Sequence, residues 1–315
     1  MSELTAQRSG ANGHWTVIIN PAAGRGRRRT HVPALLDAIE AMARAGTPVE
    51  VHVSTSAADA LASAAKAAAN GRDLVAAGGD GTVGAIAGVA ADHGVRMAIV
   101  PCGSGNDFAT TLGYDTSASP AETLAVLGDG GVDRTIDLGR VNDRWYCSVT
   151  ATGFDSEANR WANGVTRLTG TPLYVAAVVR TLASYRPHPF RVTVDGEQHE
   201  LRAWMVSVGN STTYGGGMRI TPDARLDDGL VDVCAIDGTV VSRPKLLRHF
   251  PKVFKGAHGA IEGVEMWRGA SVTIESLDSS VPIEVFADGE RVGPLPATMR
   301  AVANALTVRV PGTSA

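Results

Sequence analysis

The sequence predicts an N-terminal α/β domain with a mostly parallel sheet and a C-terminal antiparallel β-sandwich-like domain. Short apolar strands alternate with alanine-rich helical segments over residues 1–135, and strands separated by turn pairs fill residues 136–301. Alternating strands and helices form a parallel sheet covered on both faces, whereas strands joined by Asp-Gly pairs form hairpins. With 315 residues, the chain is long enough for two such domains, each with its own core.

The strands of the first half are short apolar runs, each followed by a loop and a helical segment. We expect strands at Trp15 to Ile19, Val49 to Ser54, Leu74 to Ala77 and Met97 to Val100, with helices at about Val32 to Ala45 and Ala57 to Ala69. The carboxyl ends of parallel strands meet at one edge of the sheet, and ligands bind there. The loops after these strands are therefore the expected site.

The second half changes to strands separated by pairs of turn residues. The expected strands are Val141 to Val149, Phe190 to Val194, Arg202 to Val208, Leu230 to Ile236, Ala270 to Ile274 and Ile283 to Ala287, with turns at Asn142-Asp143, Asp195-Gly196, Asp228-Gly229 and Asp288-Gly289. Glycine accepts the positive φ that hairpin turns require. Helices are expected at Pro172 to Ser184 and Pro244 to Lys255, and the last apolar strand, Ala305 to Val310, fits either domain.

Composition and charge exclude several classes of protein. Hydrophobic residues make up 44% and charged residues 19% of the chain, which is typical of a globular protein. The net charge of −3 supplies no global attraction to nucleic acid, so we expect no such partner. We expect no transmembrane segment, since the apolar stretch Leu173 to Val179 is far shorter than a span of roughly 20 residues. Met1 to His14 lacks the apolar centre of a secretory leader, and the three separated cysteines fit a reducing cytoplasm.

Three glycine-rich stretches each follow an expected strand and lead towards a helix. They are Asn20 to Arg25, Gly78 to Thr82 and Pro101 to Asp107. Glycines let backbone N–H groups approach phosphate oxygens, and the N-terminus of the following helix adds a partial positive charge. Each loop alone is also compatible with an ordinary turn. Neither GxxxxGK[ST] nor the full dinucleotide fingerprint is present.

Three side chains in these loops add chemistry to the glycines. The hydroxyls of Thr82 and Ser104 can donate to phosphate. Asp80 would repel a phosphate unless a cation lay between them, so it indicates a magnesium-bridged nucleotide. The loops together predict a nucleotide-binding edge.

At these loops the sequence resembles the catalytic domain of the diacylglycerol kinase family, in its soluble bacterial lipid kinase branch, which is related to sphingosine kinases. The similar segments are Ile19 to Gly24, Gly78 to Thr82, Gly103 to Phe108, Thr152 to Asp155, Gly209 to Ser211, Gly215 to Gly217, Thr221 to Leu230 and Asp288 to Glu290. NAD kinases also carry the second segment, whereas the ordered series is specific. One departure is Gly84, where relatives usually carry asparagine. The resemblance implies an active site in the interdomain cleft and a return of residues 302–315 to the first domain.

The resemblance also implies that the first domain binds ATP. The implied contacts come from the loops after its strands: Asn20, Pro21, Gly24, Ser54 with Thr55 as the near alternative, Gly78, Gly79, Asp80, Gly81, Thr82 and Ser104. Arg25 either neutralises phosphate charge or is simply solvated.

Two carboxylates flank an expected hairpin tip. Asp288 and Glu290 stand on either side of Gly289. A plain turn would also explain Asp288, and an exposed strand residue in contact with solvent would also explain Glu290. Phosphoryl transfer to an alcohol usually needs a carboxylate that accepts the hydroxyl proton. The resemblance implies this role for Glu290 and a magnesium-binding or orienting role for Asp288.

The stretch Asp223 to Asp232 holds four carboxylates, which indicate either an acidic surface turn or a cation site. The resemblance implies a structural Mg²⁺ bound by Asp228 and by the backbone carbonyls of Arg225 and Leu230. Such an ion would stiffen the second domain rather than take part in the chemistry.

Asp107 and Asp155 face the cleft if the architecture of the family holds. Either can then bind the head of the substrate that carries the hydroxyl group. Asp107 equally suits the N-terminus of its helix, where a carboxylate complements the helix dipole. Both interpretations stay open from the sequence.

Residues 243–255 place four basic side chains, Lys245, Arg248, Lys252 and Lys255, along one side of an expected helix and apolar side chains along another. Such a segment either packs its apolar side on the sheet or lies on an anionic membrane surface. Pro251 would kink or divide the helix in both cases.

These observations together predict an ATP-dependent lipid kinase that phosphorylates a lipid hydroxyl, with diacylglycerol as the leading substrate. ATP and Mg²⁺ are the expected cofactors, and the expected partner is a lipid reached by transient, peripheral contact with the membrane surface. Two alternatives stay open: an enzyme similar to NAD kinases, and a nucleotide-binding regulator without catalysis.

Overall fold

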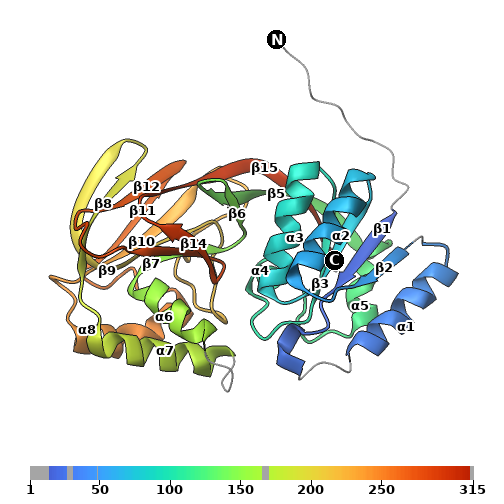
Figure 1. The fold of residues 1–315 in the computed structure, drawn as a ribbon, viewed down its shortest axis with the longest axis horizontal. Coiled ribbons are helices and arrows are strands. Elements are labelled where there is room, and N and C mark those ends of the chain that lie inside the picture. Colours follow the sequence, from blue (N-terminus) through green and yellow to red (C-terminus); the bar gives the residue numbers. More distant parts are fainter. Residues whose placement is uncertain (1–13, 27–30, 48, 165–169, 313–315) are drawn as a thin grey trace, which may run out of the picture.

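The computed structural model describes residues 14–26, 31–47, 49–164 and 170–312. In its N-terminal half, four strands pair in parallel in the order β4-β3-β1-β2: β1 (Trp15–Ile19), β2 (Val49–Val53), β3 (Asp73–Gly78) and β4 (Met97–Pro101). The helices are α1 (His31–Arg44), α2 (Ala57–Ala69), α3 (Asp80–His93), α4 (Asp107–Thr111) and α5 (Pro120–Leu124). α2 packs beside α3, and α1 packs beside α5 (Figure 1). The predicted parallel α/β domain is confirmed.

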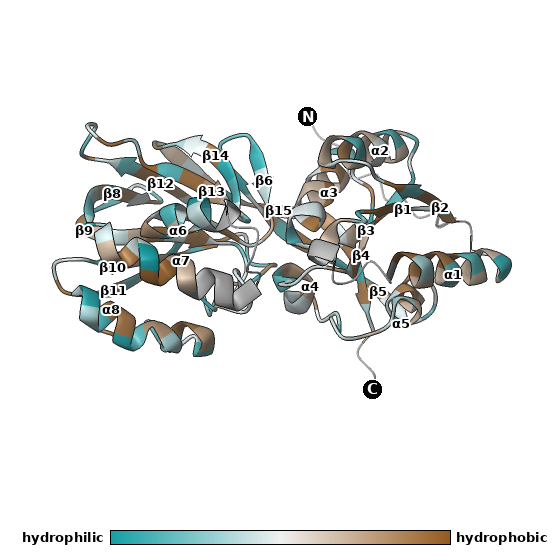
Figure 2. Cartoon of the chain, turned by 60° about the horizontal axis from the view of Figure 1, so that its bottom comes forward, coloured by the Kyte–Doolittle hydropathy of each residue, from teal (hydrophilic) through white to brown (hydrophobic). Residues whose placement is uncertain are grey.

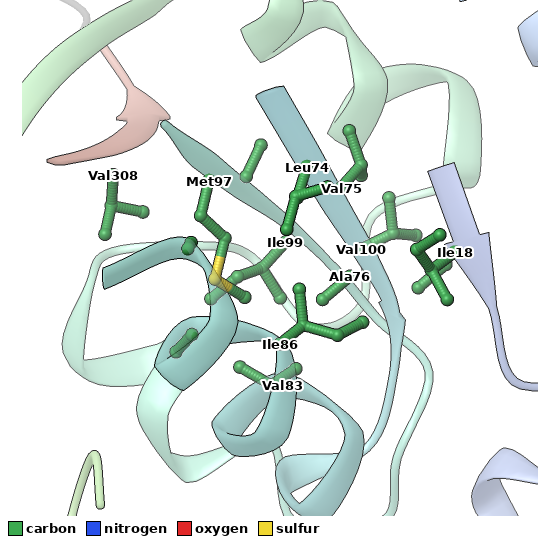
Figure 3. Packing of buried hydrophobic residues seen from close by; sticks show 14 of the residues in the cluster. Ile18, Leu74, Val75, Ala76, Val83, Ile86, Met97, Ile99, Val100 and Val308 are labelled. Carbon is green, nitrogen blue, oxygen red and sulfur yellow. The ribbon is translucent and has the colours of Figure 1, made fainter. Parts of the chain in front are cut away.

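Apolar residues of these strands form a core between the helices and the sheet. Val17 and Leu74 are 0% exposed, and the other apolar residues of β1 and β3 are at most 2% exposed. Figure 3 shows Ile86 of α3 packed near Met97 of β4, with Val308 at the side of the cluster. Continuous apolar strands are typical of a sheet covered on both faces, and burying a side chain of this size contributes roughly 1.5–3 kcal/mol.

The C-terminal half is built from antiparallel strands, as predicted. They are β7 (Val149–Gly153), β8 (His188–Val194), β9 (Glu197–Gly209), β10 (Val231–Asp237), β11 (Val264–Gly269), β12 (Ser271–Ser276), β13 (Glu284–Ala287) and β14 (Glu290–Pro294). The helices α6 (Phe154–Asn163), α7 (Gly170–Ser184) and α8 (Arg243–His249) lie together along one side of these strands (Figures 1 and 2). Within the described ranges, no helix has both the length and the apolar character that crossing a bilayer requires.

Two long strands join the halves. β5 (Gly131–Val141) and β15 (Ala297–Pro311) pair antiparallel, with a bulge between Val302 and Leu306. β15 starts beside β12 and ends beside β4, where Val308 pairs with Met97, so it runs from one half into the other (Figure 1). The described strands therefore form one 15-stranded sheet. β5 runs through residue 135, so a domain boundary at that point stays a prediction.

The structure differs from the sequence prediction in the second half. The expected strand at 141–149 is interrupted, because Asn142 takes a φ of 50° and reverses the chain into β6 (Arg144–Tyr146). The pair Asp228-Gly229 does not join two paired strands; it leads into β10, whose partners are β9 and β11. Strand β11 and helix α6 were not predicted, because both are short and carry few apolar residues, although Phe154, Ala158 and Trp161 of α6 have helical spacing.

The expected helix at 244–255 is divided where Pro251 predicts. α8 ends at His249, and a 3₁₀ segment, η3 (Phe250–Lys255), continues the chain. Pro251 has no N–H to donate to the preceding turn, so the α-helical hydrogen-bond pattern stops there.

Candidate active site

Asn20 fixes the loop that follows β1. Its Nδ2 donates to Thr82 Oγ1 at 2.8 Å, and its Oδ1 accepts the N–H of Ala22 at 3.0 Å. Gly24 has a φ of 66°, in the left-handed region that favours glycine. Asn20 therefore ties the first glycine loop to the second. Pro21 is half-buried in the first loop, and the side chain of Arg25 lies outside the described part of the chain.

The second glycine loop runs directly into the first turn of α3. Gly79 is the N-cap residue and has no side chain to bond the N–H groups that follow it. Gly78 lies so close to Thr82 that an added Cβ would be 2.6 Å from Thr82 Cβ. A helix N-terminus without a capping side chain binds anions through its N–H groups and its dipole. The sequence Gly78 to Thr82 thus presents an uncapped helix N-terminus, suited to an anion, at the carboxyl end of β3.

The third loop, which follows β4, packs against the second loop through direct contact between their backbones. An added Cβ on Gly103 would lie 2.6 Å from Gly79 Cα, so this approach requires glycine. Asn106 closes the loop, because its side chain both accepts from Gly103 N (2.8 Å) and donates to Gly103 O (3.0 Å). The carboxylate of Asp80 in turn accepts the Asn106 N–H at 2.8 Å. Ser104 is left exposed at the tip of the loop.

Asp107 connects the first half of the chain to the second. Its two carboxylate oxygens accept the N–H groups of Gly216 and Gly217, at 2.8 and 2.7 Å. The side chain is 8% exposed although Asp107 is the first residue of α4. The carboxylate thus holds a glycine-rich segment of the second half against the strand ends of the first.

Asp288, at the tip of the β13–β14 hairpin, points into the protein. Its oxygens accept the N–H groups of Cys147, Ser148 and Val149 at 2.6, 2.8 and 3.2 Å. A Cβ at Gly84 would lie 3.3 Å from Asp288 Oδ2. The absence of a side chain at position 84 therefore leaves room for this buried carboxylate.

Glu290 is the first residue of β14. Its side chain is exposed, and its Oε1 lies 3.9 Å from the place that a Cβ at Gly81 would occupy. Gly81 belongs to the first turn of α3. The hairpin thus brings a solvent-accessible carboxylate from the second half of the chain to the uncapped N-terminus of α3 in the first.

The second and third glycine loops, the hairpin tip and the Tyr214–Gly216 segment line a cleft of about 220 Å³. It is lined by Asp80, Ser104, Gly105, Asp107, Phe108, Cys147, Ser148, Asn159, Tyr214, Gly215, Gly216, Asp288 and Gly289. Residues from both halves of the chain contribute to its walls. The cleft brings Asp288 together with Asp80, Ser104 and Asp107, which lie far from it in the sequence.

Three carboxylates in the cleft are electrostatically unfavourable without a cation. Burial raises the pKa values of Asp80 and Asp107 and raises the pKa of Asp288 to about 6. The charge of Asp80 raises the pKa values of Asp107 and Asp288 further, while backbone N–H donors oppose the shifts. In the described part of the chain, no three acidic, histidine or cysteine side chains can hold a metal ion by themselves. A divalent cation would fit here if phosphate oxygens completed its coordination.

Ser54 follows β2 at the same edge, and its hydroxyl is already used. It is 5% exposed and donates to the carbonyl of Ile19 at 3.0 Å. Because its proton is used in this bond, the Ser54 oxygen can only accept a hydrogen bond from a ligand. Thr55 is exposed, and its hydroxyl donates to Asp59 at 3.1 Å.

Asp155 lies behind Tyr214, one side chain away from the cleft. It is 1% exposed and accepts the Tyr214 hydroxyl at 2.8 Å. Burial raises the pKa of Asp155 to about 7, although this hydrogen bond acts in the opposite direction. Tyr214 lines both the cleft and a second cavity of about 60 Å³, in whose wall Asp155 stands.

This second cavity is apolar. Its walls come from α6, α7, α8, η3 and the sheet, and include Phe154, Val178, Leu182, Met205, Met218, Ile236, Leu246, Phe250 and Val253. His258 is a polar exception: its Nε2 donates to the carbonyl of Ile220 at 2.9 Å, and its buried Nδ1 has no partner among the described residues. The cavity therefore offers apolar surface and one unsatisfied acceptor behind Tyr214.

The acidic stretch before β10 is organised partly by its own hydrogen bonds. Asp228 Oδ1 accepts the N–H of Leu230 at 3.1 Å. Asp232 pairs with Arg268 at 2.8 Å, and its second oxygen is buried without a partner among the described residues. The Arg225 side chain pairs with Asp227, so the backbone carbonyl is the group of Arg225 that can bind a cation. A carboxylate and backbone carbonyls on one tight loop suit a hard cation. The Mg²⁺ site expected at this loop stays a prediction.

Sequence reasoning missed several residues that shape the cleft. Asn106 had a usable signal, because it stands directly before a helix and takes a φ of 58°, which asparagine tolerates better than most residues. Asn159 and Tyr214 had none, since a polar or aromatic side chain becomes a cleft residue only through tertiary contact.

Comparisons with known proteins agree with this arrangement. Residues 14–141 match the sequence model of the diacylglycerol kinase catalytic domain, and residues 148–310 match that of the YegS C-terminal NAD kinase beta sandwich-like domain. A crystal structure of a diacylglycerol kinase from Bacillus anthracis str. Sterne overlaps with a TM-score of 0.71 at 20% identity, covering 96% of this chain and 99% of that one. A second crystal structure from the same organism overlaps with a TM-score of 0.76 at 22% identity, covering 96% and 98%. These two structures establish the shared fold.

Two curated relatives are similar over nearly their whole length. A protein of Mycobacterium tuberculosis (strain ATCC 25618 / H37Rv) named diacylglycerol kinase is 38% identical over 306 residues, which cover 95% of this chain and 96% of that protein. A diacylglycerol kinase of Bacillus subtilis (strain 168) is 28% identical over 89% of this chain and 90% of its own length. The chain therefore belongs to the diacylglycerol kinase catalytic-domain family and is a lipid kinase.

Proposed function

We propose that this kinase transfers the γ-phosphate of Mg·ATP to the free hydroxyl of diacylglycerol and so forms phosphatidic acid. The observation that carries this proposal is the cleft, where the uncapped N-terminus of α3 lies opposite the hairpin that bears Glu290. The names of the Mycobacterium tuberculosis and Bacillus subtilis relatives favour diacylglycerol over other lipid alcohols.

The polyphosphate of ATP would lie along the three glycine loops. The N–H groups at the start of α3 and the exposed hydroxyl of Ser104 supply donors, and Asn20 holds the first loop against Thr82. Mg²⁺ bound with the nucleotide would neutralise phosphate charge and relieve the repulsion around Asp80 and Asp288. Ser54 would accept a hydrogen bond rather than donate one.

The lipid would enter from the second half of the chain, with its hydroxyl in the cleft and its apolar part towards the second cavity. Tyr214 lines both spaces, so the two cavities are neighbours with this side chain between them. Asp155 would then act through the Tyr214 hydroxyl, and Asp107 would act by holding Gly216 and Gly217 in place. The substrate meets the enzyme at the membrane surface, from the cytoplasmic side where ATP is available.

The chemical step is an in-line displacement at the γ-phosphorus. The hydroxyl oxygen of the lipid forms a bond to phosphorus while the bond to the β–γ bridging oxygen breaks, and ADP leaves with that electron pair. The hydroxyl proton passes to the Glu290 carboxylate, which is exposed and close to the α3 N-terminus. Asp288 is bound by three backbone N–H groups, so it orients the hairpin rather than accepting the proton.

An acceptor screen tests this function. The purified protein is incubated with γ-labelled ATP and, separately, with diacylglycerol, monoacylglycerol, a sphingoid base, a prenol and NAD, and the products are identified by mass spectrometry. We expect phosphatidic acid from diacylglycerol. Labelled NADP would favour the NAD kinase alternative, and ATP binding without transfer to any acceptor would favour a regulator.

A further inference from the structure

The segment formed by α8 and η3 differs in charge from the rest of the protein. Residues 242–261 contain five lysines and arginines and no aspartate or glutamate, whereas the whole chain has a net charge of −3. Arg248, Lys252 and Lys255 are exposed, and none of them takes part in an ion pair within the described ranges. This segment therefore presents uncompensated positive charge.

A fourth cation lies beside these three. Arg219 is exposed, and its backbone N–H donates to the carbonyl of Val253 in η3 at 3.0 Å. The remaining cations of the segment are used within the protein: Lys245 bonds to Glu262, and Arg243 bonds to the carbonyl of Tyr185. The basic surface consequently consists of Arg219, Arg248, Lys252 and Lys255.

The same segment carries an apolar contact point and covers the apolar cavity. Leu247 is 45% exposed between these cations, although leucine is usually buried. Leu247 also lines the edge of the cavity behind Tyr214, whose wall includes Leu246, Phe250 and Val253, so the apolar side is largely packed as an ordinary domain helix would be. Figure 2 shows α8 with both hydrophilic and hydrophobic segments, on the side that it shares with α6 and α7.

We infer that the α8–η3 surface, comprising Arg219, Leu247, Arg248, Lys252 and Lys255, docks the enzyme onto an anionic lipid bilayer. Charge complementarity favours this occupant, because anionic headgroups attract clustered lysines and arginines while zwitterionic ones do not. A bilayer also supplies the apolar layer that Leu247 can enter. The inference rests on the proposed function in one respect: docking here brings the cavity behind Tyr214 next to the source of the lipid.

Vesicle sedimentation of the full chain without ATP tests the docking. The protein is mixed with phosphatidylcholine vesicles, or with vesicles in which phosphatidylglycerol replaces part of the phosphatidylcholine. We expect binding to the second kind only, weakened by added salt. Lys252→Glu/Lys255→Glu should weaken this binding at least about 25-fold, since each cation near an anionic surface contributes roughly fivefold. Leu247→Gln should weaken it about three- to tenfold and leave its salt dependence unchanged.

The matched control is Lys66→Glu/Arg300→Glu, which makes the same change of net charge at exposed positions of α2 and β15. A change of net charge lowers the affinity for anionic vesicles wherever the charges lie. The affinity of this control should be within about twofold of the value that the change of net charge alone produces, and far above the affinity of the α8–η3 variant. Equal losses in the two double variants, or no binding of the unmodified protein, would overturn the docking surface. Thermal unfolding verifies that both variants fold.

A second readout separates the docking from the proposed function. Kinase activity towards a water-soluble, short-chain diacylglycerol, without vesicles, should be unchanged in Lys252→Glu/Lys255→Glu. If the unmodified protein binds anionic vesicles and phosphorylates no diacylglycerol, the proposed substrate is wrong and the docking surface stands. If it phosphorylates the short-chain lipid and ignores anionic vesicles, the docking surface is wrong.

Discussion

The Asp107 carboxylate accepts a 2.7 Å hydrogen bond from the backbone N–H of Gly217, so that one side chain joins the two walls of the cleft. Its other oxygen bonds to Gly216, and Asp80 lies on the same side of the cleft as Asp107. The separation of the two walls of the cleft therefore depends on this buried contact.

Replacement of Asp107 by asparagine should loosen the cleft. An asparagine side chain keeps one acceptor but turns an NH₂ group towards the second glycine N–H, so the free energy of unfolding should fall by about 1–3 kcal/mol. Denaturant unfolding measures this loss. Asp143→Asn, at an exposed turn, serves as the control and should change stability by less than about 0.5 kcal/mol. Equal stability of the two variants would contradict the bridging role.

Glu290→Gln should retain ATP binding and lose about 10²- to 10⁴-fold in transfer, because the amide cannot accept the hydroxyl proton. Turnover is measured with γ-labelled ATP, and nucleotide binding is measured by calorimetry. Glu197→Gln, at an exposed position of β9, should behave as the unmodified protein. Normal turnover of Glu290→Gln would remove Glu290 as the base.

Gly103→Ala should separate the second and third glycine loops. The new methyl group would lie 2.6 Å from Gly79 Cα, which is backbone and cannot rotate away. We expect at least a tenfold loss of ATP affinity, since the phosphate-binding turn would shift, together with roughly 1–3 kcal/mol lower stability. At Gly259 an added Cβ meets its nearest neighbour at 3.5 Å, so Gly259→Ala is the control. ATP affinity of Gly103→Ala equal to that of the control would refute the close-approach argument.

The buried Asp155 makes stability depend on pH. Its pKa of about 7 lies above the ordinary carboxyl value of 3.8, so the folded protein keeps a proton that the unfolded chain has already lost. The contribution of this group to stability is complete below about pH 4 and is lost as the pH rises through 7. Asp155→Asn should remove this slope and be more stable above pH 7, by up to about 4 kcal/mol. Unfolding curves across this range would show no difference between the two proteins if the assignment is wrong.

The loop before β10 should bind Mg²⁺ in the absence of nucleotide. Added Mg²⁺ is expected to raise the midpoint of thermal unfolding, and a chelator should reverse the change, because an ion that binds only the folded state stabilises it. Asp228→Asn keeps the acceptor for the Leu230 N–H but removes the charge, so its unfolding should be insensitive to Mg²⁺. An identical response in both proteins would place the metal elsewhere.

Local sequence patterns were sufficient for the elements that are continuous apolar runs or that begin at a clear cap. The strands β1, β3 and β4 are continuous apolar runs, and α2 begins at a serine cap, so their residues leave few other conformations. The hairpin tips at Asp195-Gly196 and Asp288-Gly289 were equally clear, because both residues of each pair take positive φ values. The strand ends and their glycine loops therefore follow from local patterns alone.

The contacts across the cleft could not be derived in this way. Asp288 resembles an ordinary turn residue, yet its carboxylate is buried against Cys147, Ser148 and Val149. Asp155 belongs to Thr152 to Asp155, one of the segments that resemble the family, yet its side chain lies behind Tyr214 instead of at the surface of the cleft. These positions depend on how two halves of the chain dock, and docking leaves no period or spacing in the sequence.

The sequence by itself determined the parallel and antiparallel parts of the sheet and the three glycine-rich turns, because backbone conformation and the pattern of alternating or continuous apolar residues are local properties. Only the tertiary structure decided that Glu290 approaches Gly81, that Asp107 spans the cleft and that an apolar cavity lies behind Tyr214. These relationships arise from the long β5–β15 pair, which holds the two halves of the chain together. The energy of contacts between the halves depends on distances between residues that are far apart in the sequence.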